Sequence, residues 1–184
     1  MNLALYDNSD FNRGAPPWKE LLWVLTRCIF FQNSFPWPSE LRVELLRSFG
    51  AKIGKGVVIR ANVNVSFPWR LTISDNVWIG EDVGILSLAP VTIGSNVCIS
   101  QRAYLCTGSH DFRRDDFKLK TAPVIIEDAT WIAASAFVGP GVTIGKGSVV
   151  SAGAVVMGNV PVNSFVQGNP AKVVDSGQRA VSFS

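Results

Sequence analysis

An aliphatic residue recurs at every sixth position over most of this chain, and no other feature constrains the fold as strongly. The series starts at Ile53, shifts by two residues at Ile73 and at Ile93, and then runs without a break from Ile126 to Val156. A second series of small or β-branched residues follows four positions later, and glycine often comes directly after the aliphatic residue. Neither the helical period of 3.6 residues nor the alternation of a simple strand produces this pattern.

A period of six predicts a short strand followed by a tight turn, with three such units closing one triangular coil. The aliphatic side chains then point into the prism, the small ones lie near its corners, and glycine supplies turn geometry that other residues resist. Successive coils satisfy their backbone groups by parallel pairing at a spacing of ~4.8 Å. We therefore predict an all-β solenoid, a parallel β-helix of hexapeptide repeats that contains about five coils over residues 51–165.

Three segments lie outside the repeat. Residues 111–123, DFRRDDFKLKTAP, are charged and non-periodic, and we interpret them as a loop inserted at one corner of the solenoid. Residues 1–50 contain two short helical segments, the second with Ser39 as a plausible N-cap, and we expect them to cap the open end of the prism. Residues 166–184 are expected to form a C-terminal tail.

The first helical segment leaves a second interpretation open. Aromatic side chains gather between Trp18 and Trp37, beside Lys19 and Arg27, as in amphipathic elements that lie on a membrane surface. The apolar stretch from Leu21 to Phe31 is too short to span a bilayer. A peripheral membrane contact is therefore an alternative to simple capping.

Composition excludes several classes of protein. A net charge of +3 without a dense Lys/Arg tract argues against nucleic acid as a partner. Three cysteines without a CxxC pair or a secretory signal indicate the reducing cytoplasm. The lone histidine, His110, rules out a metal site that needs several histidines from one chain, so we expect no metal.

Several stretches resemble the hexapeptide-repeat acyltransferases, and more narrowly the group of colanic acid biosynthesis, maltose and galactoside acetyltransferases. They are CISQRAYLCTGSHDFRRDDF, PVIIEDATWIAASAFVGPGVTIGKGSVVSAGAVV, the ending VQGNPAKVV and the opening YDNSDFNRG. The resemblance implies a left-handed coil, a homotrimer, and acetyl-CoA as donor at the seam between subunits. Handedness comes from the resemblance, because most parallel crossovers are right-handed and the period alone does not specify it.

His110 is the strongest candidate for catalysis. A sugar hydroxyl barely ionises at neutral pH, so its attack on a thioester needs a base, and an imidazole is suited to that task. Asp111 is expected either to orient the imidazole or to be a solvated loop acid. Ser109 falls in the series of small residues, so we expect it to pack in a corner, which disfavours a serine–histidine hydrolase.

The resemblance also assigns residues to the donor. Trp131 would pack against the pantetheine arm, the backbone N–H of Ala134 would face the thioester oxyanion, and Lys172 would meet a CoA phosphate. Further positions along the CoA path are Ala152, Met157 and Gly158. Relatives often carry Thr-Lys in place of Met157-Gly158 and a basic residue in place of Asp175, so the 3′-phosphate clamp is reduced unless Lys146 or Arg179 compensates.

The acceptor side departs further from the maltose and galactoside group. Gly80 stands where those relatives have an asparagine that contacts the sugar, and Ser87 stands where they have an acid. Their sugar contacts therefore do not transfer to this chain. The polar candidates here are Glu81, Asp82, Arg113 and Arg114.

These features predict an acetyl-CoA-dependent O-acetyltransferase that acts on a sugar hydroxyl of a surface polysaccharide or its precursor. His110 would be the general base, and transfer would be direct, in a ternary complex without an acyl-enzyme. N-acetylation of an amino-sugar nucleotide remains an alternative, because it would use the same base and donor. A non-catalytic structural β-helix is disfavoured by the inserted loop, and a zinc carbonic anhydrase on this fold by the single histidine. The expected location is the cytoplasm, with contact at the inner membrane face if the helix binds lipid.

Overall fold

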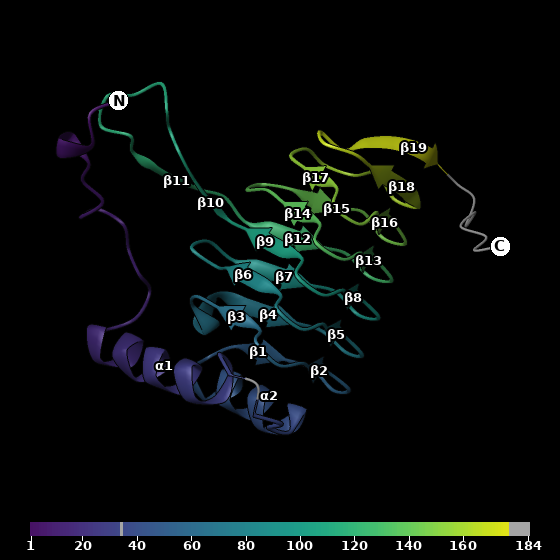
Figure 1. Ribbon diagram of the computed structural model, residues 1–184, viewed down its shortest axis with the longest axis horizontal. Coiled ribbons are helices and arrows are strands. Elements are labelled where there is room, and N and C mark those ends of the chain that lie inside the picture. The colour runs from purple at the N-terminus through teal and green to yellow at the C-terminus, as the bar shows by residue number, and fades with distance from the viewer. Residues whose placement is uncertain (34, 177–184) are drawn as a thin grey trace.

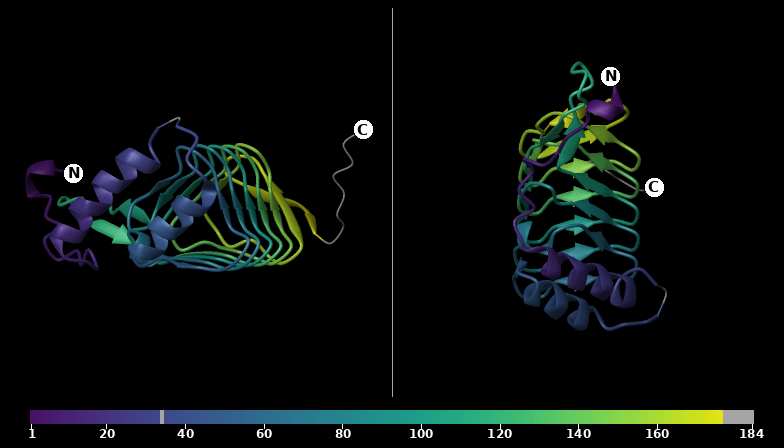
Figure 2. Two further views of the ribbon diagram at one scale, coloured as in Figure 1. Left: turned by 90° about the horizontal axis from the view of Figure 1, so that it is seen from below. Right: turned by 90° about the vertical axis from the view of Figure 1, so that its left-hand side faces the viewer.

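Short strands at the predicted aliphatic positions stack into three parallel sheets, which form the faces of a prism (Figures 1 and 2). The computed structural model describes residues 1–33 and 35–176. The first face contains β1 (Lys52–Ile53), β4 (Leu71–Ile73), β7 (Val91–Ile93), β12 (Val124–Ile126) and β15 (Thr143–Ile144). The second contains β2 (Val58–Ile59), β5 (Trp78–Ile79), β8 (Cys98–Ile99), β13 (Trp131–Ile132), β16 (Val149–Val150), β18 (Ser164–Gln167) and β19 (Lys172–Ser176). The third contains β3 (Asn64–Val65), β6 (Gly84–Leu86), β9 (Tyr104–Cys106), β14 (Phe137–Val138) and β17 (Val155–Val156). The predicted parallel β-helix is thereby confirmed.

The aliphatic series forms the core because identical positions stack coil on coil. On the second face, Ile59 pairs in register with Ile79, which pairs with Ile99, and the column continues through Ile132 and Val150. None of these five side chains is exposed to solvent. Complete burial of such a side chain stabilises the fold by ~1.5–3 kcal/mol.

The glycine that directly follows the aliphatic residue is required by close packing between coils, whereas we expected it to be required by turn geometry. Gly80 and Gly145 do not have positive φ angles; they lie where the next coil passes too close for a side chain. A Cβ on Gly80 would lie 2.8 Å from the amide nitrogen of Gln101. The left-handed conformations occur instead further into the turns, for example at Asn76 with φ 58° and Asn96 with φ 58°. Asparagine tolerates this region better than most residues.

The insertion begins earlier than the sequence predicted. β10 (Gly108–His110) pairs antiparallel with β11 (Leu119–Thr121), so the chain leaves the solenoid before His110 and projects as a hairpin (Figure 1). Ser109 is exposed on this hairpin and does not pack in a corner, contrary to expectation. The six-residue spacing at Ser109 is coincidental, because its strand pairs with β11 and not with the neighbouring coils.

Helices α1 (Pro17–Phe30) and α2 (Ser39–Ser48) lie across the open end of the prism (Figure 2). Two short 3-10 helices, η1 (Leu3–Leu5) and η2 (Pro68–Arg70), complete the helical elements of the described residues. Trp23, Phe31 and Leu46 are almost fully buried and extend the hydrophobic core to this end. Ser39 does not cap α2; Pro38 takes the N-cap position, and the Ser39 hydroxyl accepts a hydrogen bond from the Ile59 amide at 2.8 Å.

At the other end, the segment expected to be a tail extends the second face. β18 pairs in parallel with β16, and β19 folds back antiparallel onto β18. Residues 164–167 and 172–176 therefore belong to the sheet, and Arg179 lies outside the described residues. Across the part of the chain that the structure describes, no helix is both long and apolar enough to cross a membrane.

Candidate active site

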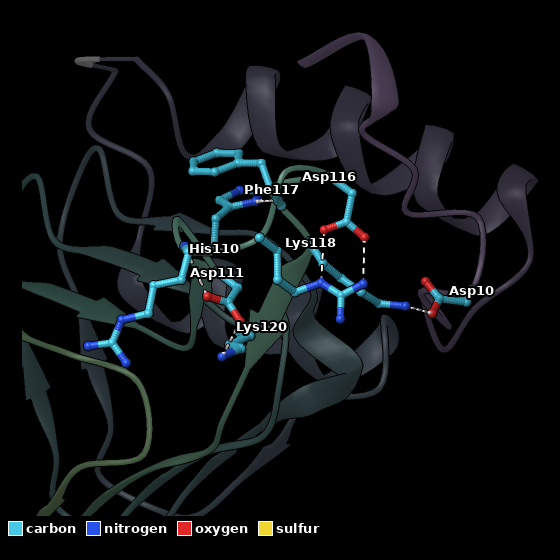
Figure 3. A network of polar contacts seen from close by, with 9 residues as sticks. Asp10, His110, Asp111, Asp116, Phe117, Lys118 and Lys120 are labelled. Carbon is cyan, nitrogen blue, oxygen red and sulfur yellow. Dashed lines mark hydrogen bonds and ion pairs between the residues drawn. The ribbon is translucent and has the colours of Figure 1, made fainter. Parts of the chain in front are cut away.

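His110 ends strand β10, where the hairpin holds its imidazole against a neighbouring backbone carbonyl (Figure 3). The Nδ1 atom lies 2.8 Å from the carbonyl oxygen of Phe117, and the ring stacks on the Phe117 ring at 4.3 Å between centroids. The two planes are only 1° apart. His110 is half-buried.

The Phe117 carbonyl determines which nitrogen of His110 can act as a base. A carbonyl oxygen can only accept, so the hydrogen bond requires the proton to reside on Nδ1. In the neutral ring, Nε2 then carries the free lone pair. The arrangement supplies an oriented base that is ready to receive a proton at Nε2.

Asp111 does not take the orienting role that the sequence left open. Its carboxylate forms an ion pair with Lys120 Nζ at 2.8 Å and accepts a hydrogen bond from the Arg113 amide (Figure 3). The hydrogen bond from Lys120 is the main cause that holds the pKa of Asp111 below its ordinary value. Asp111 therefore fixes the shape of the hairpin, and a neutral carbonyl holds the imidazole in its place.

The N-terminal segment, residues 1–12, lies along the same hairpin, which the sequence did not reveal. Tyr6 packs against His110 with 5.6 Å between ring centroids, and Asp10 pairs with Lys118 at 2.6 Å. The Asn2 amide also donates to the Asp115 carbonyl at 2.7 Å. The motif YDNSDFNRG in this segment is part of the family resemblance. Nothing in the motif specifies contact with a hairpin that lies about a hundred residues later in the chain.

Three of the predicted donor residues meet on the second face. Trp131, Ala134 and Ala152 line a hollow of about 400 Å³ together with Ser100, Gln101, Ala133, Val149, Ser151 and Phe165. The Trp131 indole donates a hydrogen bond to the Ser100 hydroxyl at 2.9 Å, which fixes one wall. Alanine and serine form much of the remaining lining, and these small residues leave room for a slender chain such as pantetheine. Ala134 donates no backbone hydrogen bond within the described residues, so its N–H is available to a ligand.

Met157 and Gly158 lie at a different corner from the Trp131 hollow. Met157 lines a second hollow, of about 490 Å³, with Ser109, Lys120, Thr121, Ala122 and Pro140. This hollow is at the corner after the third face, beside the hairpin, and Gly158 follows Met157 there. Lys172 is exposed on β19 at the end of the second face. One chain thus does not bring the histidine hairpin and the Trp131 hollow together.

The proposed acceptor residues are divided in the same way. Glu81 pairs with Arg60 at 2.9 Å and Asp82 with Arg102 at 3.9 Å, both at the corner after the second face. Arg113 and Arg114 lie on the hairpin: Arg114 pairs with Asp116 at 2.8 Å, and the Arg113 guanidinium lies over the Phe112 ring. Glu81 and Asp82 therefore lie on the Trp131 side of the prism, and the two arginines lie on the histidine side.

Within residues 1–33 and 35–176, no group of three or more His, Cys, Asp or Glu side chains is arranged to hold an ion.

Comparison with known proteins identifies the family. Residues 123–158 match the bacterial transferase hexapeptide family, described as six repeats. The chain is 44% identical over 162 residues to the putative colanic acid biosynthesis acetyltransferase WcaF of Escherichia coli, which covers 88% of this chain and 89% of that protein. It is 29% identical over 147 residues to the galactoside O-acetyltransferase of Escherichia coli, covering 78% of this chain and 72% of that protein.

Solved structures agree with this assignment. A hexapeptide-repeat acetyltransferase of Vibrio cholerae, complexed with acetyl-CoA, superimposes with a TM-score of 0.78 at 28% identity and covers 87% of both chains. A galactoside acetyltransferase in complex with CoA gives a TM-score of 0.77 at 25% identity, covering 87% of this chain and 81% of that one. The fold predicted from the hexads, including the left hand that the resemblance implied, is confirmed, and the chain belongs to the hexapeptide-repeat family of acetyltransferases.

Proposed function

We propose that this protein is an acetyl-CoA-dependent O-acetyltransferase that modifies a sugar hydroxyl of a surface polysaccharide or its precursor. The observation that carries the proposal is the His110 imidazole, whose Nδ1 is held by the Phe117 carbonyl so that Nε2 is free. The name of the relative at 44% identity supports a role in polysaccharide synthesis, and the acetyl-CoA and CoA complexes of the structural neighbours support the donor. The expected location is the cytoplasm, where acetyl-CoA is available.

His110 has a defined part in this reaction. Acetyl-CoA supplies the thioester that the sugar hydroxyl attacks. Nε2 removes the hydroxyl proton as the new C–O bond forms and later returns it to the departing thiolate, so no acyl-enzyme is needed. Trp131 and Ala152 would hold the pantetheine arm, the free N–H of Ala134 would stabilise the developing oxyanion, and Lys172 would meet a CoA phosphate.

The separation of the two hollows supports a homotrimer with the reaction at its seams. On one chain, the histidine hairpin and the Trp131 hollow lie at different corners of the prism. A three-fold arrangement of prisms would place the hairpin of one subunit beside the Trp131 hollow of the next. The active site would then be complete only between two copies.

Product analysis tests the reaction itself. With purified protein, acetyl-CoA and candidate oligosaccharides, we expect a product that gains one acetyl group and loses it again in mild alkali, because an ester is cleaved there and an amide is not. Mass spectrometry before and after alkali treatment measures both changes. An alkali-stable product would instead establish N-acetylation of an amino sugar.

Substitution of His110 tests the base. We expect His110→Ala to lower kcat by ~10²- to 10⁴-fold, because the base is lost. The melting temperature of the variant reports separately on the lost contacts of the ring with Phe117 and Tyr6. Asp111→Asn should reduce kcat far less, because that carboxylate contacts Lys120 and not the imidazole. Equal losses in the two variants, measured by steady-state kinetics, would show that Asp111 acts on the imidazole after all.

Mixed oligomers test the shared site. His110→Ala and Trp131→Ala subunits should each be nearly inactive alone, but unfolding and refolding them together should restore activity. In random trimers, about one seam in four receives an intact histidine and an intact tryptophan from its two subunits. Activity of the mixture that stays at the level of the separate variants would place both residues in the same subunit's site.

The exposed side of α1 supports a peripheral membrane contact. Trp18, Leu21, Leu25 and Ile29 recur along one side of the helix and are 64%, 61%, 52% and 55% exposed, while Trp23 on the other side is buried in the core. An apolar stripe of this size on a helix that also carries Lys19 is typical of elements that lie in the membrane interface. We propose that this stripe rests on the inner face of the membrane.

Vesicle flotation tests the membrane contact. The double variant Leu21→Gln/Leu25→Gln should bind phosphatidylglycerol vesicles at least about tenfold more weakly than the wild type, because it loses apolar area from the interface. Val162→Gln, which changes a side chain 59% exposed at the other end of the prism, is the matched control and should bind like the wild type. A changed oligomer mass of the double variant in light scattering would assign the stripe to a contact between copies.

A further inference from the structure

The N-terminal segment, residues 1–12, contacts the candidate base, and the proposed mechanism gives it no part. It runs between α1 and the hairpin and lies beside the hairpin (Figure 1). All of its residues up to Asp10 are exposed, and none of them belongs to the hydrophobic core. The contacts that it makes with the hairpin therefore need a reason other than burial of apolar surface.

The hairpin holds His110 through a residue whose backbone is strained. Phe117 supplies both the carbonyl that accepts from Nδ1 and the ring that stacks on the imidazole, and its φ angle is 48°. This left-handed conformation is uncommon for a bulky side chain and persists only where surrounding contacts enforce it. The orientation of the imidazole therefore depends on the contacts that hold this turn in place.

The N-terminal segment binds the hairpin on both sides of Phe117. Before Phe117, the Asn2 amide donates a hydrogen bond to the Asp115 carbonyl at 2.7 Å. After Phe117, the Asp10 carboxylate pairs with Lys118 Nζ at 2.6 Å (Figure 3). Two anchors from one short segment thus bracket the strained residue.

Between these two anchors, Tyr6 packs directly against the imidazole. Its ring centroid lies 5.6 Å from that of His110, and the two planes are tilted by 60°. Because the parallel Phe117 ring occupies one face of the imidazole, Tyr6 contacts the opposite face or an edge. Tyr6 directly follows η1, and its own amide donates to the Leu3 carbonyl at 3.2 Å, so its backbone is held as well. Rings on two sides restrict the rotation of the imidazole.

We propose that the N-terminal segment is part of the active site and that Tyr6 is a positioning residue for His110, an inference that rests on the proposed function. The Tyr6 ring restricts the imidazole to the orientation in which Nδ1 meets the Phe117 carbonyl and Nε2 is free. The two anchors keep the Phe117 turn in its left-handed conformation. An aromatic contact of this kind changes the population of an orientation by roughly two- to tenfold, and the orientation of a base enters the reaction rate directly.

Nitrogen NMR of the histidine ring tests this contact without acetyl-CoA or acceptor. In protein labelled with isotope-enriched histidine, His110 alone gives the ring signals, because the chain has one histidine. Their positions report which ring nitrogen carries the proton. We expect Tyr6→Ala to shift or broaden these signals, because the ring gains other orientations, and Tyr6→Phe to restore them. The wild-type signals test the tautomer on which the proposed function depends, whereas the difference between the variants tests Tyr6 alone.

A matched pair of substitutions on the same segment tests the anchors. Asp10→Ala removes the ion pair with Lys118 and should change the ring signals in the same way as Tyr6→Ala, but less, because an exposed ion pair is weak. Asp7→Ala is the matched control, since the hydrogen bonds of that carboxylate in the described residues go to Ser9, and it should give the wild-type signals. Ring signals that stay unaltered in Tyr6→Ala, or that change equally in Asp7→Ala, would overturn the positioning role.

Steady-state kinetics connects the contact with acetyl transfer. Tyr6→Ala should lower kcat roughly two- to tenfold and leave the KM for acetyl-CoA unchanged, because only the orientation of the base is disturbed. Tyr6→Phe should recover the wild-type kcat, since the ring makes the contact, and the melting temperature of each variant monitors its fold.

The kinetic outcomes separate this inference from the proposed function. A kcat of Tyr6→Phe as low as that of Tyr6→Ala would assign the effect to the hydroxyl and overturn the proposal. Changed ring signals with an unchanged kcat would remove the N-terminal segment from the active site. Wild-type activity of His110→Ala would refute the base itself and leave the contact measured by NMR standing.

Discussion

Parallel pairing between coils in exact vertical register is the constraint on which the rest of this structure depends. Each coil places one aliphatic side chain of each face above its counterpart, as in the column from Ile59 to Val150, and the backbone bonds between coils fix that alignment. The register also brings successive corners so close that Gly80 and Gly145 cannot carry a side chain. The prism is therefore rigid along its faces, and variation is confined to its corners and ends.

The candidate site residues gather at the corners of the prism, because only there can the chain leave the sheets. One corner carries the hairpin with His110, and another forms the hollow beside Trp131. Since both are anchored to the same rigid prism, no loop movement of modest size brings them together within one chain. The homotrimer that we propose would complete a site from these two parts at the seam between subunits.

The histidine shows how a backbone group can replace an acidic partner. In a triad an acid both orients the imidazole and stabilises its charge. Here the Phe117 carbonyl performs the orientation at 2.8 Å, and Asp111 stabilises the hairpin through Lys120.

The sequence by itself determined the coils and the faces, because a period of six is a local property that repeats along the chain. It also determined the single candidate base, because the chain contains one histidine. The tertiary structure decided the rest. The start of the hairpin at Gly108, the ion pair of Asp111 and the contact of Tyr6 with His110 depend on which segments meet in space. The buried charge of Arg42 is the clearest case: its position in α2 resembles that of any surface arginine on a short helix, and only the packing of that helix on the first coil removes it from water.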